Sequence, residues 1–137
     1  MIELKGIHYH PATSDKPILN GVNLKAYQGQ LITIAGASGS GKTSLIEVIS
    51  GLSSSQKGEI NWCDNPLNER QRRLLCGVVF QFPERHFLGL TVSQELRLGH
   101  RRVRGDAQSN ALNSVGLSEI DLRQAPERLS GGQQRRL

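Results

Sequence analysis

One short stretch constrains this chain more than any other: residues 36–43 read Gly-Ala-Ser-Gly-Ser-Gly-Lys-Thr. They match the pattern G-x-x-x-x-G-K-[ST], and they stand between the apolar run 31–35 and a segment with helical spacing of apolar residues. The glycines permit positive φ values, so successive backbone N–H groups can point into one concavity that suits a phosphate chain. The stretch therefore predicts a phosphate-binding loop between a strand and a helix, with a nucleoside triphosphate as its ligand.

Two side chains of this loop have definite chemical roles. Lys42 places a positive charge on the outer phosphates, and the hydroxyl of Thr43 is a suitable oxygen ligand for Mg²⁺. The helix that follows directs the positive end of its dipole at the same anion.

The apolar pattern predicts strands on both sides of the loop. The runs 31–35 and 75–80 are apolar enough to be buried in the middle of a parallel sheet. Shorter or alternating patterns predict three further strands at residues 2–7, 22–26 and 58–62. Strands that alternate with a helix indicate an α/β fold with a mixed or parallel sheet.

Helices are predicted over residues 42–50, 91–98 and 106–115. In the first, Leu45, Ile46, Ile49 and Leu52 share one face, and Gly51 ends the helix. The second opens on the capping pattern Thr91-Val-Ser-Gln94. The third places Ala107, Ala111 and Val115 on one face and stops at Gly116. We therefore expect a core domain over residues 1–87 and a helical subdomain over residues 88–137.

The composition is typical of a soluble protein. The chain has 137 residues, 36% of them hydrophobic, and a formal net charge of +5. No apolar run approaches the ~20 residues of a membrane span, so we expect any membrane role to depend on a partner. The arginines are dispersed, which is typical of solvated faces. Cys63 and Cys76 lack metal-ligand spacing, and Cys76 is expected to be a small buried residue.

A second motif lies near the end of the chain, where residues 129–136 read Leu-Ser-Gly-Gly-Gln-Gln-Arg-Arg. By itself it predicts a helix that begins after a serine cap, and such a helix start can hold an anion. Residues 129–133 also match the signature sequence of ABC-type ATPases. Gln81, after the run 75–80, matches the glutamine of that family's Q-loop, and Tyr9 matches its adenine-stacking aromatic.

Loop, glutamine and signature in this order are specific for the family, and the resemblance runs from residue 2 to residue 137. Phe80-Gln81-Phe82-Pro83-Glu84 and the helix opening at residues 91–99 most resemble the energy-coupling-factor and cobalt-type importer ATPases. The resemblance implies ATP and Mg²⁺ as cofactors, with Thr43 and Gln81 as metal ligands. It implies these contacts with the nucleotide: Tyr9, Gly36, Ala37, Ser38, Gly39, Ser40, Gly41, Lys42, Thr43, Ser44 and Gln81.

The resemblance also implies partners. Ser130, Gly131, Gly132 and Gln133 would contact the ATP of a second ATPase subunit, and residues 82–87 would meet a transmembrane subunit. The implied location is cytoplasmic, or the stroma or matrix of an organelle, beside a membrane. No counterpart of the family's Walker B aspartate, catalytic glutamate or late histidine follows the signature. We therefore expect the N-terminal part of a longer subunit, which binds Mg-ATP weakly and does not hydrolyse it alone.

Alternatives remain at several positions. Tyr9 can be an edge-strand aromatic, Gln81 a polar strand end, and Phe82 and Phe87 core residues of the helical section. At the level of function, one rival is a soluble ABC protein that acts on nucleic acid or in metal-cluster assembly, although nucleic acid is the less favoured partner. The other is a kinase or GTPase, for which the guanine-selecting Asn-Lys-x-Asp pattern is absent.

Overall fold

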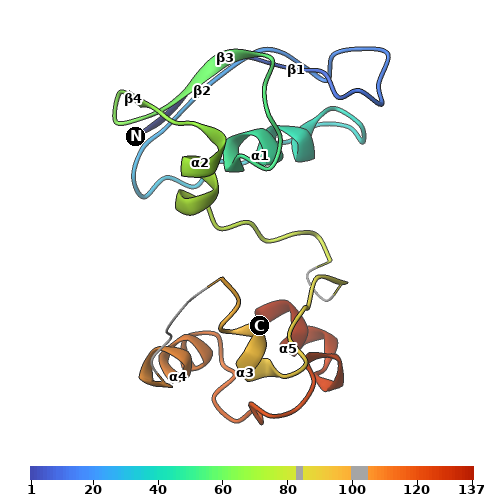
Figure 1. Ribbon diagram of the computed structural model, residues 1–137, viewed down its shortest axis with the longest axis vertical. Coiled ribbons are helices and arrows are strands. Elements are labelled where there is room, and N and C mark those ends of the chain that lie inside the picture. Colours follow the sequence, from blue (N-terminus) through green and yellow to red (C-terminus); the bar gives the residue numbers. More distant parts are fainter. Residues whose placement is uncertain (83–84, 100–104) are drawn as a thin grey trace. The chain divides into compact units, whose positions relative to one another are not determined.

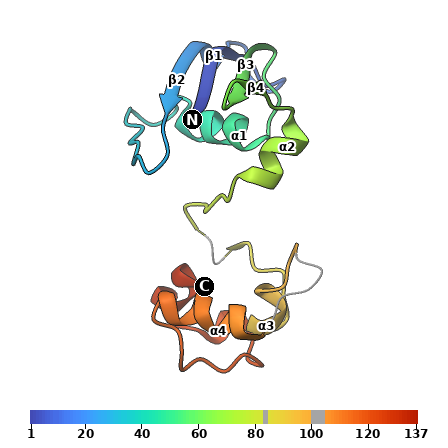
Figure 2. The same cartoon turned by 90° about the vertical axis from the view of Figure 1, so that its left-hand side faces the viewer.

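The computed structural model describes residues 1–82, 85–99 and 105–137. They divide into two compact units, Met1–Val78 and Val79–Leu137, which Figures 1 and 2 show in two views. The division of the chain into domains at residue 87 stays a prediction. Pro83 and Glu84 of the Q-loop pattern lie outside the described residues, as do Arg101, Arg102 and Arg104.

The first unit is built on a four-stranded antiparallel sheet with the order β2-β1-β3-β4. Its strands are β1 (Ile2–Tyr9), β2 (Leu19–Ala26), β3 (Lys57–Trp62) and β4 (Asn65–Pro66). In the register, Leu4 of β1 lies opposite Leu24 on one side and Ile60 on the other. The first three strands cover those predicted at residues 2–7, 22–26 and 58–62, each extended at one end.

Helix α1 (Lys42–Ser50) has the predicted bounds and packs on one face of the sheet (Figures 1 and 2). The core consists of side chains from both layers: Leu4, Ile7, Leu19 and Ile60 from the sheet, and Leu45 and Val48 from the helix. The predicted apolar face was partly wrong, because Ile46 and Leu52 are exposed. The helix turns Leu45 and Val48, three residues apart, toward the sheet.

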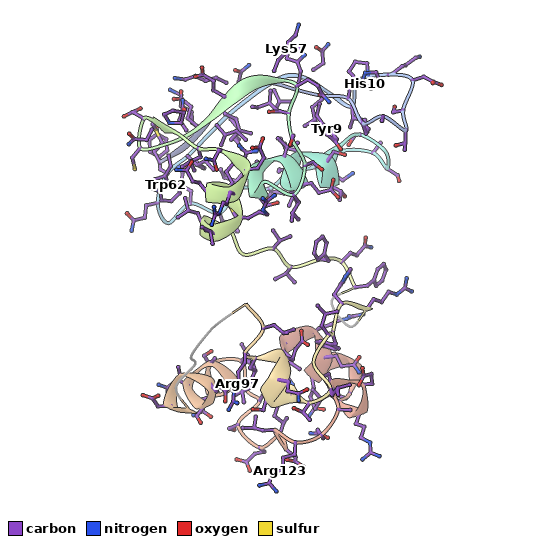
Figure 3. All side chains as sticks on the ribbon, viewed as in Figure 1. Tyr9, His10, Lys57, Trp62, Arg97 and Arg123 are labelled. Atoms are coloured by element: carbon purple, nitrogen blue, oxygen red, sulfur yellow. The ribbon has the colours of Figure 1, made fainter. Side chains whose placement is uncertain are left out.

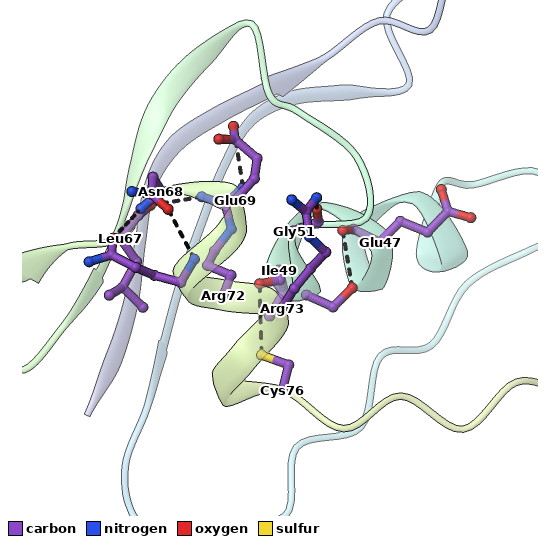
Figure 4. Close-up of polar contacts among 11 residues, drawn as sticks. Glu47, Ile49, Gly51, Leu67, Asn68, Glu69, Arg72, Arg73 and Cys76 are labelled. Atoms are coloured by element: carbon purple, nitrogen blue, oxygen red, sulfur yellow. Dashed lines mark hydrogen bonds and ion pairs between the residues drawn. The ribbon is translucent and has the colours of Figure 1, made fainter. Parts of the chain in front are cut away.

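Helix α2 (Glu69–Leu75) was not predicted from the sequence. It begins at a capping box in which the Asn68 side chain accepts from the N–H of Gln71 and the Gln71 side chain accepts from the N–H of Asn68. Figure 4 shows how α2 reaches the end of α1: Arg73 Nη1 donates to the carbonyl oxygen of Gly51 at 2.9 Å. Cys76, half-buried, ends α2 with its Sγ 3.9 Å from the carbonyl oxygen of Ile49.

The two strands predicted as buried were wrong. Residues 31–35 and 76–80 form no strand, and Leu31 and Val79 are 96% and 84% exposed. Leu75 instead ends α2. An apolar run marks a segment that can be buried, but a strand also needs neighbours for its backbone groups. Among the described residues, every paired strand is antiparallel, and none pairs with either run.

The second unit is helical. It contains α3 (Val92–Glu95), α4 (Gly105–Ser114), the 3-10 helix η2 (Pro126–Arg128) and α5 (Gly131–Arg136). Its buried apolar side chains include Val92, Leu112, Leu117, Pro126 and Leu129. No helix among residues 1–82, 85–99 and 105–137 is long and apolar enough to cross a membrane.

Two details of these helices differ from the prediction. Helix α3 ends earlier than residue 98, and Thr91 caps it by accepting from the N–H of Gln94 at 3.2 Å. The Gln94 side chain accepts instead from the N–H of Leu90, so the reciprocal half of a capping box is not made. In α4 the predicted alanine face is exposed, while Gln108 and Leu112 are buried. Small alanines gain less from burial than leucine, so the leucine decides which face packs.

Candidate functional site

The glycine-rich loop leads directly into helix α1. Gly39 and Gly41 have φ values of 79° and 89°, in the region that favours glycine. The N–H of Ser40 donates to the carbonyl oxygen of Ala37 at 3.2 Å, which closes a tight turn. A Cβ on Gly36 would lie 2.7 Å from the Ser40 hydroxyl oxygen. The turn therefore brings the Ser40 side chain against the first residue of the loop.

The side chain of Lys42 folds back onto the first two residues of the loop. Its ammonium group donates to the carbonyl oxygens of Gly36 and Ala37 at 2.9 and 2.7 Å. The loop thus wraps around a fixed positive charge, and an anion bound at the N–H groups of the turn would meet that charge directly.

The start of α1 adds to the positive potential. Its N-cap is Gly41, which supplies no capping side chain, and the first turn contains no acidic residue. The first N–H groups of the helix are therefore left for an external acceptor. Thr43, in this first turn, is exposed, and its hydroxyl is the kind of hard oxygen ligand that Mg²⁺ takes. These residues fit the triphosphate and the metal that the sequence predicts.

Core packing fixes the base of the loop. A Cβ on Gly41 would lie 2.8 Å from Cγ2 of Ile18 and 3.2 Å from its carbonyl oxygen. The carbonyl oxygen of Gly41 accepts from the N–H of Leu45, a core residue, at 2.8 Å. The sequence motif did not point to Ile18, because no local pattern links a loop residue to a contact twenty-odd positions away.

Tyr9 lies at the end of β1, where Figure 3 labels it beside His10. Its ring is half-buried and packs against the core, and its hydroxyl donates to Ser53 Oγ at 3.4 Å. Its carbonyl oxygen accepts from the N–H of Ile18 at 2.8 Å, so Tyr9 and Gly41 contact the same residue. The edge-strand alternative for Tyr9 is wrong, because β1 lies between β2 and β3 in the sheet. The base-stacking role of Tyr9 stays a prediction.

Gln81 belongs to the second unit and is exposed. Around it, the rings of Phe80 and His86 lie 4.8 Å apart, and the Arg85 guanidinium stands 4.9 Å from the centre of the Phe82 ring. Phe82 is 42% exposed, so it is not a core residue of this unit. The cluster is a surface of aromatic rings and one guanidinium cation. The assignment of Gln81 as a ligand stays a prediction.

The motif at residues 129–133 begins helix α5, as the serine cap predicts. Ser130 Oγ accepts from the N–H of Gln133 at 3.3 Å, and the Gln133 side chain accepts from the N–H of Ser130 at 2.9 Å. Because the Ser130 hydroxyl acts as an acceptor, its own proton is left to donate outward. Nothing lies within 4 Å of the positions that a Cβ would take on Gly131 and Gly132. An anion can approach the start of this helix closely.

Comparison with known proteins now decides the family. The ABC transporter family matches residues 19–137. The chain belongs to the ABC transporter family. It is 37% identical to the Arabidopsis thaliana "ABC transporter I family member 11, chloroplastic" over 99% of the chain and 55% of that protein. It is 34% identical to the energy-coupling factor transporter ATP-binding protein EcfA1 of Streptococcus pyogenes over 100% of the chain and 52% of that protein.

Solved structures agree on the fold of this ABC family member. CbiO1 of Clostridium perfringens, part of the cbiONQ transporter complex, superposes with a TM-score of 0.81 at 23% identity, over 98% of the chain and 57% of its own. The ATP-binding cassette MJ0796, a dimer with ADP and Pi bound, gives 0.74 at 25% identity, over 99% and 66%. The predicted fold class, a phosphate-loop α/β core with a helical subdomain, is confirmed. The chain spans about half the length of the two curated relatives described above.

Proposed function

We propose that the chain is the ATP-binding part of an energy-coupling-factor type ATPase subunit, which couples ATP binding and hydrolysis to a membrane partner. The observation that carries this proposal is the loop before α1, in which backbone carbonyls hold the Lys42 ammonium beside an uncapped helix start. Charge-assisted bonds to the phosphates and N–H groups from the turn then bind the triphosphate. ATP, rather than another nucleotide, is supported by the family and by the name of EcfA1.

Each residue has a role in this proposal. Residues 36–44 bind the triphosphate, and Thr43 supplies one oxygen to Mg²⁺, with Gln81 as a second ligand. Tyr9 stacks on the base, since an aromatic face gives contact area at small entropic cost. Mg²⁺ neutralises phosphate charge when it is bound.

Partners follow from the second unit. Ser130, Gly131, Gly132 and Gln133 contact the ATP of a second ATPase subunit, for which the open start of α5 is suitable. A transmembrane subunit binds at residues 82–87, where Phe82 and Arg85 are exposed. MJ0796 is dimeric and cbiO1 is part of cbiONQ, which supports assembly of this kind. The protein then works at a membrane surface, in the cytoplasm or, as the chloroplastic relative suggests, in an organelle.

Calorimetric titration of the folded chain with Mg-ATP tests nucleotide binding. We expect weak but saturable binding, and a loss of about tenfold or more in affinity in Lys42→Ala, because a charge-assisted contact with phosphate is removed. Lys57→Ala, which removes the same charge from an exposed position on β3, is the matched control and should bind as the wild type does. The absence of heat with Mg-ATP, or equal affinity in both variants, would refute the proposal.

Hydrolysis is tested separately. Glu84 and Glu95 belong to the Q-loop pattern and the helical section, and neither is expected to act as the catalytic glutamate. We therefore expect no phosphate release by the 137-residue chain alone. Turnover that Lys42→Ala abolishes would show that this expectation is wrong while leaving ATP binding intact.

A further inference from the structure

The pairing of β1 with β3 ends in an unusual way. The last paired residues are His8 and Lys57, and the N–H of Gln56 donates to the carbonyl oxygen of His8 at 3.0 Å. Beyond this point the side chain of Gln56, instead of the backbone of β3, makes the hydrogen bonds to the chain that follows β1. Its Oε1 accepts from the N–H of His10 at 2.7 Å, and its Nε2 donates to the carbonyl oxygen of His10 at 2.8 Å. One carboxamide thus pairs with both backbone groups of a single residue.

This two-point contact is not part of the core. Both Gln56 and His10 are exposed, so water could satisfy the same groups. Its effect is to fix the backbone of His10, and with it the direction in which the chain leaves Tyr9. Figure 3 labels Tyr9, His10 and Lys57 at this end of the sheet.

Tyr9 is held a second time by the same short connection. Residues 52–56 join α1 to β3, and they include Ser53, whose Oγ accepts from the Tyr9 hydroxyl. The N–H groups of Leu52 and Ser53 donate to the carbonyl oxygen of Glu47 in α1, at 2.8 and 3.1 Å. The connection therefore links the Tyr9 ring and the next residue's backbone to the helix that begins at the phosphate loop.

We propose that Gln56 is a positioning residue for the base end of the nucleotide site: it fixes the end of β1 so that the Tyr9 ring stands at a set distance from the phosphate loop. This inference rests on the proposed function, in which Tyr9 stacks on adenine. Stacking depends on the place and tilt of the ring. Binding of the phosphate chain depends on Lys42 and the loop amides, which Gln56 does not contact.

The two halves of the ligand can therefore be separated by experiment. Mg-ATP probes base and phosphates together, and Mg-tripolyphosphate probes the phosphates alone. For Gln56→Ala we expect ATP affinity to fall by about threefold to tenfold, because a displaced Tyr9 ring loses part or all of its stacking with the base. Affinity for tripolyphosphate should remain within about twofold of wild type, since a twofold change is a small fraction of one hydrogen bond.

Three further variants sharpen the test. Gln56→Glu keeps the acceptor for the N–H of His10 but places a second acceptor oxygen against the His10 carbonyl oxygen, which repels it. The ratio of its dissociation constant for ATP to that for tripolyphosphate should therefore be at least as large as in Gln56→Ala. Tyr9→Ala removes the ring and so gives the value of this ratio when stacking is lost completely. Ser54→Ala, on an exposed side chain of the same connection, should keep the wild-type ratio. Amide hydrogen exchange at His10 should quicken in Gln56→Ala, which reports the contact without any ligand.

The outcomes are distinct. Selective loss of ATP affinity, with faster exchange at His10, supports the inference. Equal loss of both affinities shows a general structural role, and no loss of either shows that Gln56 positions nothing; each result overturns the inference while the proposed function stands. If the wild type binds tripolyphosphate as tightly as it binds ATP, the base adds no affinity, and both the role of Tyr9 and this inference are refuted. If wild type binds neither probe, the proposed function itself fails.

Discussion

Replacing Gly41 by alanine is the sharpest test of how the phosphate loop is built. Gly41 has a φ of 89° and is the N-cap of α1. A non-glycine residue in the left-handed region costs roughly 1–2 kcal/mol. The new Cβ would also lie 2.8 Å from Cγ2 of Ile18 and 3.2 Å from its carbonyl oxygen. Crowding of this kind costs typically about 1–3 kcal/mol, so we expect Gly41→Ala to destabilise the chain by about 3 kcal/mol.

Gly39→Ala is the matched control. Gly39 belongs to the same loop and has a similar φ of 79°, but nothing lies within 4 Å of its added Cβ. Only the conformational cost applies, about 1–2 kcal/mol. The difference between the two variants therefore measures the crowding of the new Cβ against Ile18 and against Cδ2 of Leu19, which it would approach to 3.2 Å.

Urea denaturation, monitored by circular dichroism, measures both free energies of unfolding. A domain has roughly 5–15 kcal/mol in total, so a difference of about 2 kcal/mol is easily resolved. In an Ile18→Ala background the added cost of Gly41→Ala should shrink, because the methyl group that the new Cβ meets is gone. Equal losses for Gly39→Ala and Gly41→Ala would refute the view that packing against Ile18 fixes the loop.

Three further changes test other parts of the structure. Glu3 is buried between two lysines, and Lys25, at 2.7 Å, is the main cause that lowers the pKa of its carboxyl. The contribution of Glu3 to stability is full above the unfolded pKa of about 4.3 and is lost as pH falls through the lower folded pKa. In Glu3→Gln the urea midpoint should therefore depend less on pH below pH 5, and an unchanged dependence would contradict this. Ser130→Ala removes the cap of α5 and should cost about 1 kcal/mol of helix stability, seen as faster amide exchange at the start of α5. Arg72 is buried, and its Nε and Nη2 have no hydrogen-bond partner, although Nη2 lies 3.7 Å from the Glu69 carboxylate; burial lowers the pKa of Arg72. Arg72→Met should therefore leave stability within about 1 kcal/mol of wild type or raise it. A loss of several kcal/mol would show that the bond of Arg72 to Leu67 and its ion pair with Glu69 dominate.

The sequence was sufficient where structure is decided locally. The helix over residues 42–50 has the predicted bounds, because a glycine on each side fixes where it begins and ends. The serine cap before α5 was likewise correct. Each of these features depends on residues within one turn of the helix end, so a short pattern contains the whole cause.

Predictions failed where the cause lies far away in the chain. The runs 31–35 and 75–80 have the composition of buried strands, yet Leu31 is 96% exposed. Helix α2 is a different case: its cause is local, a capping box made by Asn68 and Gln71, and it was missed because no apolar periodicity accompanies that pattern. Gln56 carries no signal at all in the sequence: its partner, His10, is 46 positions away.

This contrast explains why the phosphate loop can be formed although the run before it is not a strand. A strand at residues 31–35 would fix only the entry to the loop. The described contacts fix its exit instead: Gly41 packs on Ile18, its carbonyl oxygen bonds to Leu45 in the core, and Lys42 bonds back to the first two loop carbonyls. The geometry of the proposed phosphate site is thus set by α1 and the β1–β2 hairpin. Polar substitutions at the exposed Leu31 should accordingly change phosphate affinity much less than Gly41→Ala does.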